Sequence, residues 1–575
     1  MRNTYFSTKK RLFAMFVAIA FIFFVIFLRL GYIQIVWGKK LQTRALEQWT
    51  RDLPVTADRG DITDTNGIVF ASSGTSYTVY VRPNSVSNHS LVAELLSQAL
   101  KLSYQDVYDK VTAKISENTI KRKITVEEAN LIRSYNLEGV YLAADTSREY
   151  VYGDFLSQVL GFVSSDNTGQ SGLEAYYDKY LRGVDGAILT PSDLVGKELE
   201  GESAYYTPPV SGLNVVTTID FRIQRVVENV LDLVMQGHSP KGARCIVVNP
   251  QTGEVLAMSS KPSVDLNNLP RDNIGELMAS TKNMLITAVY EPGSTFKVLT
   301  AAAMLEEYAR GNPKAHSASY VFPNNANFRI VDGSRVKCWT THTSSKHCNQ
   351  NLGDALNNSC NPIFTDIGLS LGKETMYKYL SAFGYGAVSG IDFAGEQAGL
   401  LVAESAVTNG DLARISFGQT IAVPPLQLAM APSAAVNGGL LMQPYLVKEI
   451  RTQEGELVKK FYPTVRQRAI SEKVSRELAG LLENVVTNGS GKQAYIEGFK
   501  VGGKTGTAQK YENGHIAVGK YVSSFVGFFP ADNPQYLALM LVDEPTGAHY
   551  GSTVAAPYAK MIFQQIINYK NLKPA

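Results

Sequence analysis

The sequence lacks several features that would each indicate a different class of protein. Its net charge is only +3, and no dense Lys/Arg tract occurs beyond the first dozen residues, so nothing suggests nucleic acid as a ligand. It has no internal repeat and no low-complexity tract. With 45% hydrophobic and 10% aromatic residues, it also lacks the composition of a disordered chain. A folded chain of 575 residues is expected to form roughly two or three domains.

The sequence contains only one long hydrophobic run and lacks a second. This run lies at residues 12–28, directly after a short basic cluster. In a helix this run covers about 25 Å, and residues 30–37 extend it into an interfacial aromatic belt. We therefore expect residues 1–11 to be a cytoplasmic tail and residues 12–37 a single-pass anchor in the cell membrane, with the rest of the chain extracellular. A cleaved signal peptide is the alternative, but no convincing A-x-A cleavage site follows the run.

We expect two domains beyond the anchor. Residues 38–213 mix strand patterns, as at residues 77–82, with helical ones, as at residues 91–102, which predicts an α+β pedestal module. Residues 214–575 alternate strand and helix patterns, which predicts a mixed α/β domain. The strands expected in it lie at residues 243–248, 254–259, 503–509, 523–529 and 536–542, and a closing helix is expected at residues 556–569.

Ser294 and Lys297 form the first candidate catalytic pair. A serine hydroxyl is a poor nucleophile at neutral pH, so a catalytic serine needs a nearby base and donors for the oxyanion. Pro292 and Gly293 predict a turn before a helix, which would put Ser294 in the first turn and Lys297 on the same face. A desolvated lysine there could accept the serine proton. Alone, the pattern favours a solvated helix start.

Two further elements follow in order, Ser359-Cys-Asn361 and Lys504-Thr-Gly-Thr. Ser359 could relay a proton to a leaving amine, and Asn361 could hydrogen-bond a substrate amide. Lys504 and Thr505 could hold a terminal carboxylate, and Gly506 would leave the strand face open to a substrate backbone. Together with the first pair, these elements match the Ser-x-x-Lys, Ser-x-Asn and Lys-Thr-Gly set of penicillin-binding proteins and class A β-lactamases.

Over nearly its whole length the chain resembles a class B penicillin-binding protein. The resemblance implies a peptidoglycan D,D-transpeptidase. Ser294 would attack the penultimate D-alanine of a stem pentapeptide, release the terminal D-alanine and form an acyl-enzyme, which an amine of a neighbouring stem would resolve. The N–H groups of Ser294 and Thr507 would hold the oxyanion, and β-lactams would acylate Ser294 as covalent inhibitors. The stretches that carry the resemblance are residues 59–67, 172–177, 217–224, 248–257 and 416–419, besides the three catalytic motifs.

The chain has no glycosyltransferase-like segment before residue 214, so we expect another protein to polymerise the glycan. The resemblance implies a membrane glycan polymerase as partner of the anchor and pedestal, with lipid-linked or nascent glycan as substrate; the pedestal could instead be only a spacer. A D,D-carboxypeptidase or β-lactamase remains an alternative. A β-lactam-sensing receptor is disfavoured because only residues 1–11 precede the anchor. Division, elongation and sporulation roles are not distinguished.

No cofactor is needed for this chemistry, but one segment could bind a structural metal. Asp332, Cys338, His347 and Cys348 lie close together in the sequence and form a candidate zinc set. Such a site, just ahead of Ser359, could fix that catalytic element in place. A disulfide between Cys338 and Cys348, or free thiols, are the alternatives.

The other cysteines are expected to be structural. Cys245 lies in an apolar strand pattern, and Cys360 is the middle residue of its motif, so both are expected to be buried. His342 is expected to be solvated.

Overall fold

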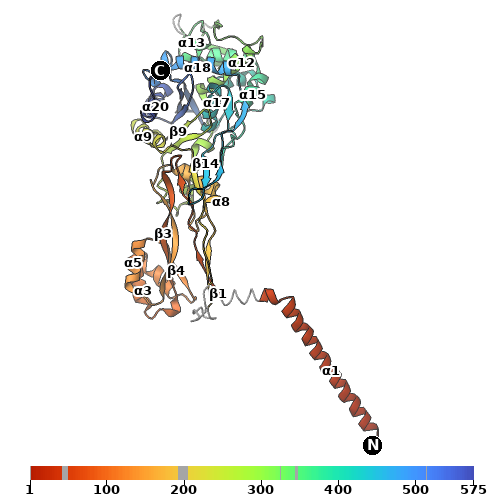
Figure 1. Ribbon diagram of the computed structural model, residues 1–575. Helices are drawn as coiled ribbons and strands as arrows, with labels where there is room; N and C mark the ends of the chain where they lie inside the picture. Colours follow the sequence, from red (N-terminus) through yellow and green to blue (C-terminus); the bar gives the residue numbers. More distant parts are fainter. Residues whose placement is uncertain are drawn as a thin grey trace. The chain divides into compact units, whose positions relative to one another are not determined.

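The computed structural model describes residues 2–41, 50–191, 205–323, 326–342, 347–512 and 515–574 (Figure 1). By its contacts the chain divides into two units, and both are discontinuous in sequence. Two segments that precede residue 213 in the sequence pack with the C-terminal part. The first unit comprises Met1–Asp58, Thr75–Ser147 and Val184–Val210, and the second Arg59–Gly74, Arg148–Gly183 and Ser211–Ala575.

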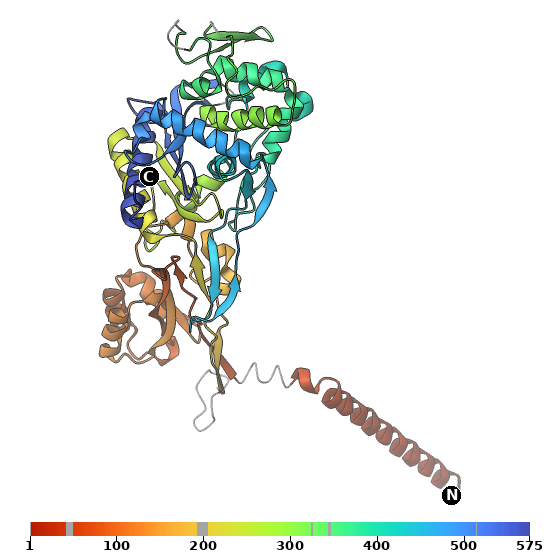
Figure 2. The ribbon, with the colours of Figure 1, turned by 45° about the horizontal axis from the view of Figure 1, so that its top comes forward.

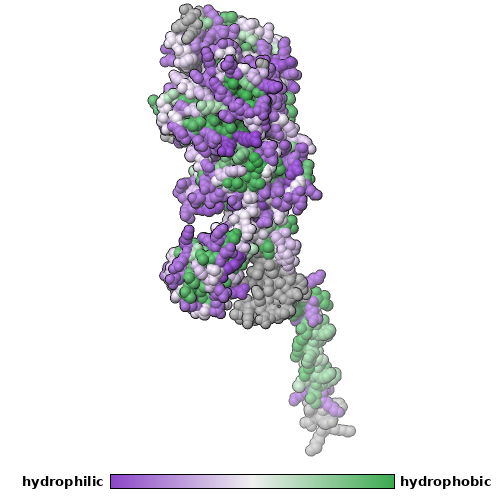
Figure 3. Space-filling model, turned by 60° about the vertical axis from the view of Figure 1, so that its left-hand side comes forward, coloured by the Kyte–Doolittle hydropathy of each residue, from purple (hydrophilic) through white to green (hydrophobic). Residues whose placement is uncertain are grey.

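The first unit begins with the long helix α1 (Arg2–Ile35). Its stretch Lys9–Ile35 is long and apolar enough to cross a membrane, and none of it is buried. Figure 3 shows a mostly hydrophobic surface along the middle of this helix, with hydrophilic residues toward its ends. This helix fits the single-pass anchor expected at residues 12–37.

The rest of the first unit is an α+β module. The second half of β3 (Val69–Val81) pairs antiparallel with β4 (Asn118–Ile124). Three helices build a core with these strands, in which Val79, Leu96 and Ile132 are buried. The helices are α3 (His89–Leu100), α4 (Tyr104–Val111) and α5 (Val126–Tyr135), and a separate three-stranded sheet contains β1 (Thr50–Val55), β6 (Gly186–Pro191) and β7 (Tyr205–Thr207).

A five-stranded antiparallel sheet organises the second unit, in the order β10-β9-β19-β18-β17 (Figure 2). The expected strands are all present in it. Early and late parts of the chain are neighbours, because β9 pairs with β19. The strands are β9 (Gly242–Val248), β10 (Val255–Lys261), β17 (Gly502–Glu512), β18 (His515–Phe529) and β19 (Tyr536–Asp543).

Side chains of this sheet alternate between two cores, as the period of a strand requires. In β9, Cys245 and Val247 pack in a cluster with α9 (Phe221–His238) and α20 (Ala556–Lys570). Ile246, between them, belongs to the larger cluster on the other face. Figure 1 and Figure 2 show α9 and α20 together beside the sheet. Cys245 is thus buried, as the sequence predicts.

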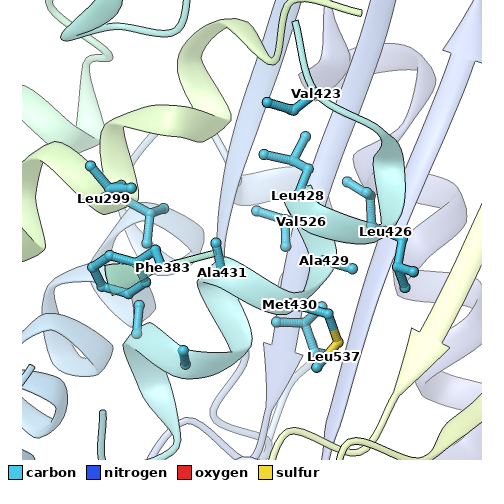
Figure 4. Packing of buried hydrophobic residues seen from close by; sticks show 14 of the residues in the cluster. Leu299, Phe383, Val423, Leu426, Leu428, Ala429, Met430, Ala431, Val526 and Leu537 are labelled. Atoms are coloured by element: carbon cyan, nitrogen blue, oxygen red, sulfur yellow. The ribbon is translucent and has the colours of Figure 1, made fainter. Parts of the chain in front are cut away.

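The larger core surrounds α17 (Pro425–Val436), a helix in which every residue is buried. A helix buried all round is mostly apolar, and the two polar side chains of this one, Gln427 and Ser433, make hydrogen bonds. Figure 4 shows Met430 and Ala431 among side chains from α12 (Lys297–Ala309) and the sheet. Other helices of the unit are α10 (Ile274–Thr281), α11 (Met284–Thr287), α13 (Leu352–Asn357), α14 (Asn361–Leu371), α15 (Lys373–Ala382), α16 (Asn409–Ile415), α18 (Glu472–Thr487) and α19 (Gly551–Val554).

The early segments join the second unit through strand pairing and buried ion pairs. β2 (Ile62–Thr63) pairs parallel with β8 (Asn214–Thr217). Arg59 Nε lies 2.6 Å from Glu174 Oε2, and Arg148 Nε lies 2.6 Å from Glu174 Oε1. Smaller elements here include α6 (Ser157–Leu160), α7 (Gly172–Tyr176), α8 (Asp178–Leu181), β11 (Phe328–Val331), β12 (Ser334–Lys337), β13 (Leu440–Met442), β14 (Val447–Arg451), β15 (Leu457–Lys460) and β16 (Val465–Arg468).

Candidate active site

Ser294 lies in a tight turn packed against the edge strand β17. The turn is the 3-10 helix η2 (Gly293–Phe296), which α12 continues. Gly293 has a φ of 58°, and a Cβ atom there would lie 3.3 Å from the Cβ of Ala508. The expected turn is therefore present, as a 3-10 turn ahead of the α-helix. It presses Ser294 against the strand that carries the Lys-Thr-Gly motif.

The side chain of Ser359 accepts hydrogen bonds from two lysines. Lys297 Nζ donates to Ser359 Oγ at 3.1 Å and to its carbonyl oxygen at 2.8 Å. Lys504 Nζ donates to the same Ser359 Oγ at 3.0 Å. Ser359 has a φ of 53°, a strained conformation for a residue other than glycine, of the kind that collects at functional sites. The structure thus brings residues from three motifs into one hydrogen-bonded network.

Asn361 is held in this network by both ends of its amide. Its Oδ1 accepts from Lys297 Nζ at 2.7 Å, and its Nδ2 donates to the carbonyl oxygen of Lys337 at 3.0 Å. The side chain at the start of α14 is therefore oriented before any substrate binds.

Both lysines are completely buried. Burial lowers the pKa of Lys297 to about 8, although the sulfurs of Cys338 and Cys360 act in the opposite direction. Burial, together with the charge of Lys297, holds the pKa of Lys504 well below its usual range. A neutral amine at Lys297 is thus accessible near neutral pH, as a general base requires.

Gly506 makes room for the turn that carries Ser294. A Cβ atom at this position would lie 2.4 Å from Ser524 Oγ and 3.0 Å from Thr295 Cγ2. The turn therefore fills part of the space that we expected a substrate backbone to use. The neighbouring Thr505 has its hydroxyl 3.2 Å from that of Ser490, and Thr507 accepts from Gly551 N at 3.1 Å.

A cavity of about 610 Å³ opens over these groups. Ser294, Ser359 and Asn361 line it, together with Thr505, Gly506 and Thr507. Lys297 and Lys504 are not part of its lining and lie behind Ser359, which both contact. Among the described residues that line the cavity there is no carboxylate side chain, and Arg335, Lys337 and Arg414 give it a positive rim.

Several lining residues were not identified from the sequence. Ser490 belongs to none of the three motifs, and only its distance to Thr505 shows that it is part of the site. Trp339 is 58% exposed at the cavity, and its Nε1 donates to the carbonyl oxygen of Asn358 at 2.9 Å. An exposed tryptophan is an unusual surface residue, but its exposure cannot be read from the sequence. His549, which stacks on Tyr521, also lines the cavity.

The stretch 416–419, which belongs to the family resemblance, supports the Ser294 turn from behind. Thr300 Oγ1 donates to the carbonyl oxygen of Ser416 at 2.8 Å, and Gly293 N donates to that of Gly418 at 2.8 Å. These bonds hold the start of the turn and the first part of α12, which follows it.

Next to Ser359, four potential metal ligands converge. The ligand atoms of Cys338, His342, His347 and Cys360 all lie within 4.8 Å of one another. Cys338 Sγ is 3.9 Å from His347 Nδ1, and Cys360 Sγ is 3.7 Å from His342 Nε2. A hydrogen bond from Cys360 lowers the pKa of Cys338 and raises that of Cys360.

This cluster differs from the set suggested by the sequence. Cys338 and His347 belong to both, but Asp332 Oδ2 accepts instead from Gly410 N at 2.7 Å, and Cys348 lies outside the cluster. Cys360, which is buried as expected, and His342, which was expected in solvent, take their places, because the start of α14 returns to the loop after β12. The four cysteines are free, so the alternative disulfide is not formed.

Comparison with known proteins identifies related families and structures. The Penicillin binding protein transpeptidase domain matches residues 243–567, and the Penicillin-binding Protein dimerisation domain matches residues 54–217. Stage V sporulation protein D of Bacillus subtilis is 39% identical over 580 residues, which cover 100% of this chain and 88% of that protein. Peptidoglycan D,D-transpeptidase FtsI of Escherichia coli is 26% identical over 95% of this chain and 89% of its own length.

The fold is also found in solved structures. Penicillin binding protein 3 of Mycobacterium tuberculosis, complexed with aztreonam, has a TM-score of 0.69 at 22% identity, covering 91% of this chain and 98% of that chain. A likeness at this identity concerns the fold alone. The two family matches and the 39% identical relative show that the chain belongs to the class B penicillin-binding proteins.

Proposed function

We propose that this protein cross-links peptidoglycan stem peptides as a serine D,D-transpeptidase. The observation that carries the proposal is the network in which Lys297 and Lys504 both donate to Ser359, beside a cavity that Ser294 lines. The relative from Escherichia coli is named a peptidoglycan D,D-transpeptidase, which supports the same reaction.

In the first step, Ser294 Oγ attacks the carbonyl carbon of the penultimate D-alanine, and its proton passes to the neutral amine of Lys297. The low pKa of Lys297 supports this role. The oxyanion would accept from the N–H groups of Ser294 and Thr507. The close packing of Gly293 against β17 supports that arrangement. Breaking the peptide bond then expels the terminal D-alanine, whose amine takes a proton delivered through Ser359.

In the second step, the amine of a neighbouring stem peptide attacks the acyl-enzyme. This amine loses a proton to the network of Lys297, Ser359 and Lys504. Ser294 takes a proton back as its ester bond breaks, and the new amide bond is the cross-link. Because Lys504 is buried behind Ser359, direct contact with the substrate carboxylate would come from Thr505 and Thr507, which line the cavity.

A D,D-carboxypeptidase would use the same acyl-enzyme but transfer it to water. The two reactions separate when the purified full-length protein receives a synthetic stem pentapeptide and a labelled acceptor amine. We expect a labelled amide product that the Ser294→Ala variant does not form. Shortened tetrapeptide with no labelled amide, at saturating acceptor, would identify a carboxypeptidase instead.

The hydrophobic helix α1 supports a location in the cell membrane, with the catalytic unit outside the cell. The basic residues 9–11 before its apolar part favour a cytoplasmic N-terminus. We propose a membrane glycan polymerase as the partner that supplies the nascent glycan. β-Lactams would acylate Ser294 as covalent inhibitors, in line with the aztreonam complex of the Mycobacterium tuberculosis protein.

The cluster beside Ser359 is proposed as a structural zinc site. Two thiols and two imidazoles are a donor set that zinc binds in closed tetrahedral sites, and the ligand atoms lie close enough together to share one ion. Cys360 stands between Ser359 and Asn361, so an ion there would tie the loop after β12 to the catalytic element. Its role would be positional, since all proton transfers above use other residues.

Metal analysis of the purified protein tests this site. We expect about one zinc ion per chain in the wild type, its loss in Cys338→Ser, and a lower melting temperature after chelation. Cys348→Ser is the matched control, because Cys348 lies in the same loop but outside the cluster. Full zinc content in Cys338→Ser, or equal loss in both variants, would contradict the assignment.

A further inference from the structure

The second unit contains another large cavity, of about 640 Å³, that shares no lining residue with the active-site cavity. Its walls come from the short helices α7 and α8, the loop after α15, and the end of β15 with the residues that follow. The residues that matter most are Tyr177, Tyr180, Phe461, Tyr462, Lys179 and Lys459. The catalytic mechanism uses none of them.

One wall of this cavity is a rigid aromatic surface. The ring of Tyr177 lies 6.3 Å from that of Phe461, at 85°, and 6.3 Å from that of Tyr180. Its hydroxyl donates to Asp392 Oδ2 at 2.6 Å, which fixes the ring. Tyr462 also lines the cavity and is 68% exposed, so its ring is accessible to a ligand. Fixed aromatic faces with a hydroxyl at one edge suit flat ligands that have an apolar and a polar side, such as sugar rings.

The charge of the cavity is positive. Lys179 Nζ lies 4.8 Å from the ring centroid of Tyr180, and Lys459 Nζ lies 4.6 Å from that of Phe461. Within the described part of the chain, neither lysine has a carboxylate partner, and both are exposed. These two ammonium groups are therefore available to an anion, beside aromatic faces.

The one acidic residue in the lining does not offset them. Asp392 Oδ1 accepts from Leu446 N at 2.6 Å, and Oδ2 accepts from Val447 N at 2.9 Å as well as from Tyr177. Burial raises the pKa of this carboxyl group. Both oxygens of Asp392 are therefore engaged in hydrogen bonds within the protein. The groups that the cavity presents to a ligand are aromatic rings and ammonium groups.

We propose that this cavity binds an acidic glycan, with sugar rings on the tyrosine faces and carboxylates at Lys179 and Lys459. The ligand would be the glycan strand whose stem peptides enter the active site, so the proposal rests on the proposed function for the supply of that polymer. A glycan held there would keep the enzyme on one strand between successive cross-links.

Binding of defined glycans to the full-length protein in detergent tests this site. The main probe is a peptide-free peptidoglycan oligosaccharide, whose muramic acid residues carry free carboxylates. A chitooligosaccharide of equal length has the same kind of backbone without carboxylates, and poly(glycerol phosphate) has charge without sugar rings in its backbone. We expect the acidic glycan to bind most tightly of the three.

Two variants remove the two kinds of contact. The double variant Lys179→Gln/Lys459→Gln and the variant Tyr462→Ala should each weaken binding of the acidic glycan by about tenfold or more. Lys473→Gln and Tyr308→Ala are matched controls on exposed positions outside both cavities, and should bind as the wild type does. Penicillin should acylate all these variants at the wild-type rate, which shows that they are folded.

Three results would overturn the proposal. The first is that the wild type shows no saturable binding of the acidic glycan. The second is that all variants bind this glycan equally. The third is that poly(glycerol phosphate) binds as tightly as the acidic glycan and that Tyr462→Ala does not affect its binding. Failure of the proposed function would appear elsewhere, as missing acylation or cross-linking in the wild type. The two failures are therefore distinguishable.

Discussion

The amine of Lys504 lies 3.0 Å from the hydroxyl oxygen of Ser359, and Lys297 donates to the same oxygen at 3.1 Å. With two donors directed at its lone pairs, the Ser359 hydroxyl hydrogen points away from both lysines. This geometry leaves the hydroxyl free to donate into the cavity that Ser359 lines. The two lysines thus orient a proton toward the place where a leaving amine would form.

Replacing Ser359 by alanine removes this oriented hydroxyl. We expect Ser359→Ala to slow acylation by a stem pentapeptide by about 10²–10⁴-fold, the usual contribution of a positioned proton donor. Stopped assays with a labelled pentapeptide measure the rate. Ser490→Ala, which removes another hydroxyl at the cavity wall, should have a smaller effect; equal rates in the wild type and Ser359→Ala would contradict the relay.

The acylation rate should depend on pH through Lys297. Its pKa is lowered to about 8, so the amine is mostly protonated at pH 6 and mostly neutral at pH 9. Only the neutral amine accepts a proton, so the rate of acylation by penicillin should rise by about tenfold per pH unit below the pKa and level off above it. Circular dichroism over the same range controls for unfolding. A rate that falls as the pH rises would exclude Lys297 as the base.

Gly506→Ala tests the packing of the Ser294 turn against β17. The added Cβ atom would meet Ser524 Oγ at 2.4 Å, so strand or turn must shift, and we expect about 1–3 kcal/mol lower stability together with slower acylation. Gly480→Ala is the control: it lies in α18 with nothing within 4 Å, and alanine there should stabilise by about 0.5–1 kcal/mol. Chemical denaturation measures both.

Glu174 should be essential for the stability of the second unit. It is 0% exposed and paired with Arg59 and Arg148, so Glu174→Gln leaves buried cations with too little negative charge. We expect a loss of about 3–5 kcal/mol in the free energy of unfolding. Glu472→Gln, which breaks the exposed pair with Arg476, should cost less than about 0.5 kcal/mol. Similar losses in both variants would contradict this account.

Local patterns predicted most of the secondary structure and the three catalytic motifs. Strands such as β9 and helices such as α20 follow from periodicity, and the catalytic motifs have fixed short spacings. Long-range pairing was not predictable in the same way. β2 joins the second unit through β8, and no local pattern indicates that partner.

The metal cluster shows the same limit. Asp332 and Cys348 were grouped with Cys338 because they are near it in sequence. The fold instead satisfies Asp332 with a backbone N–H of α16 and brings in Cys360 from the start of α14. Of the set proposed from the sequence, Cys338 and His347 lie in the cluster, but the remaining partners depend on tertiary structure.

The central claim is that Ser294 is the nucleophile, and intact-mass spectrometry of the purified full-length protein with penicillin tests it most directly. The account predicts a stable adduct of one penicillin mass on the wild type and none on Ser294→Ala, with equal melting temperatures confirming that both are folded. An adduct of the same mass on Ser294→Ala, or none on the folded wild type, would contradict the assignment.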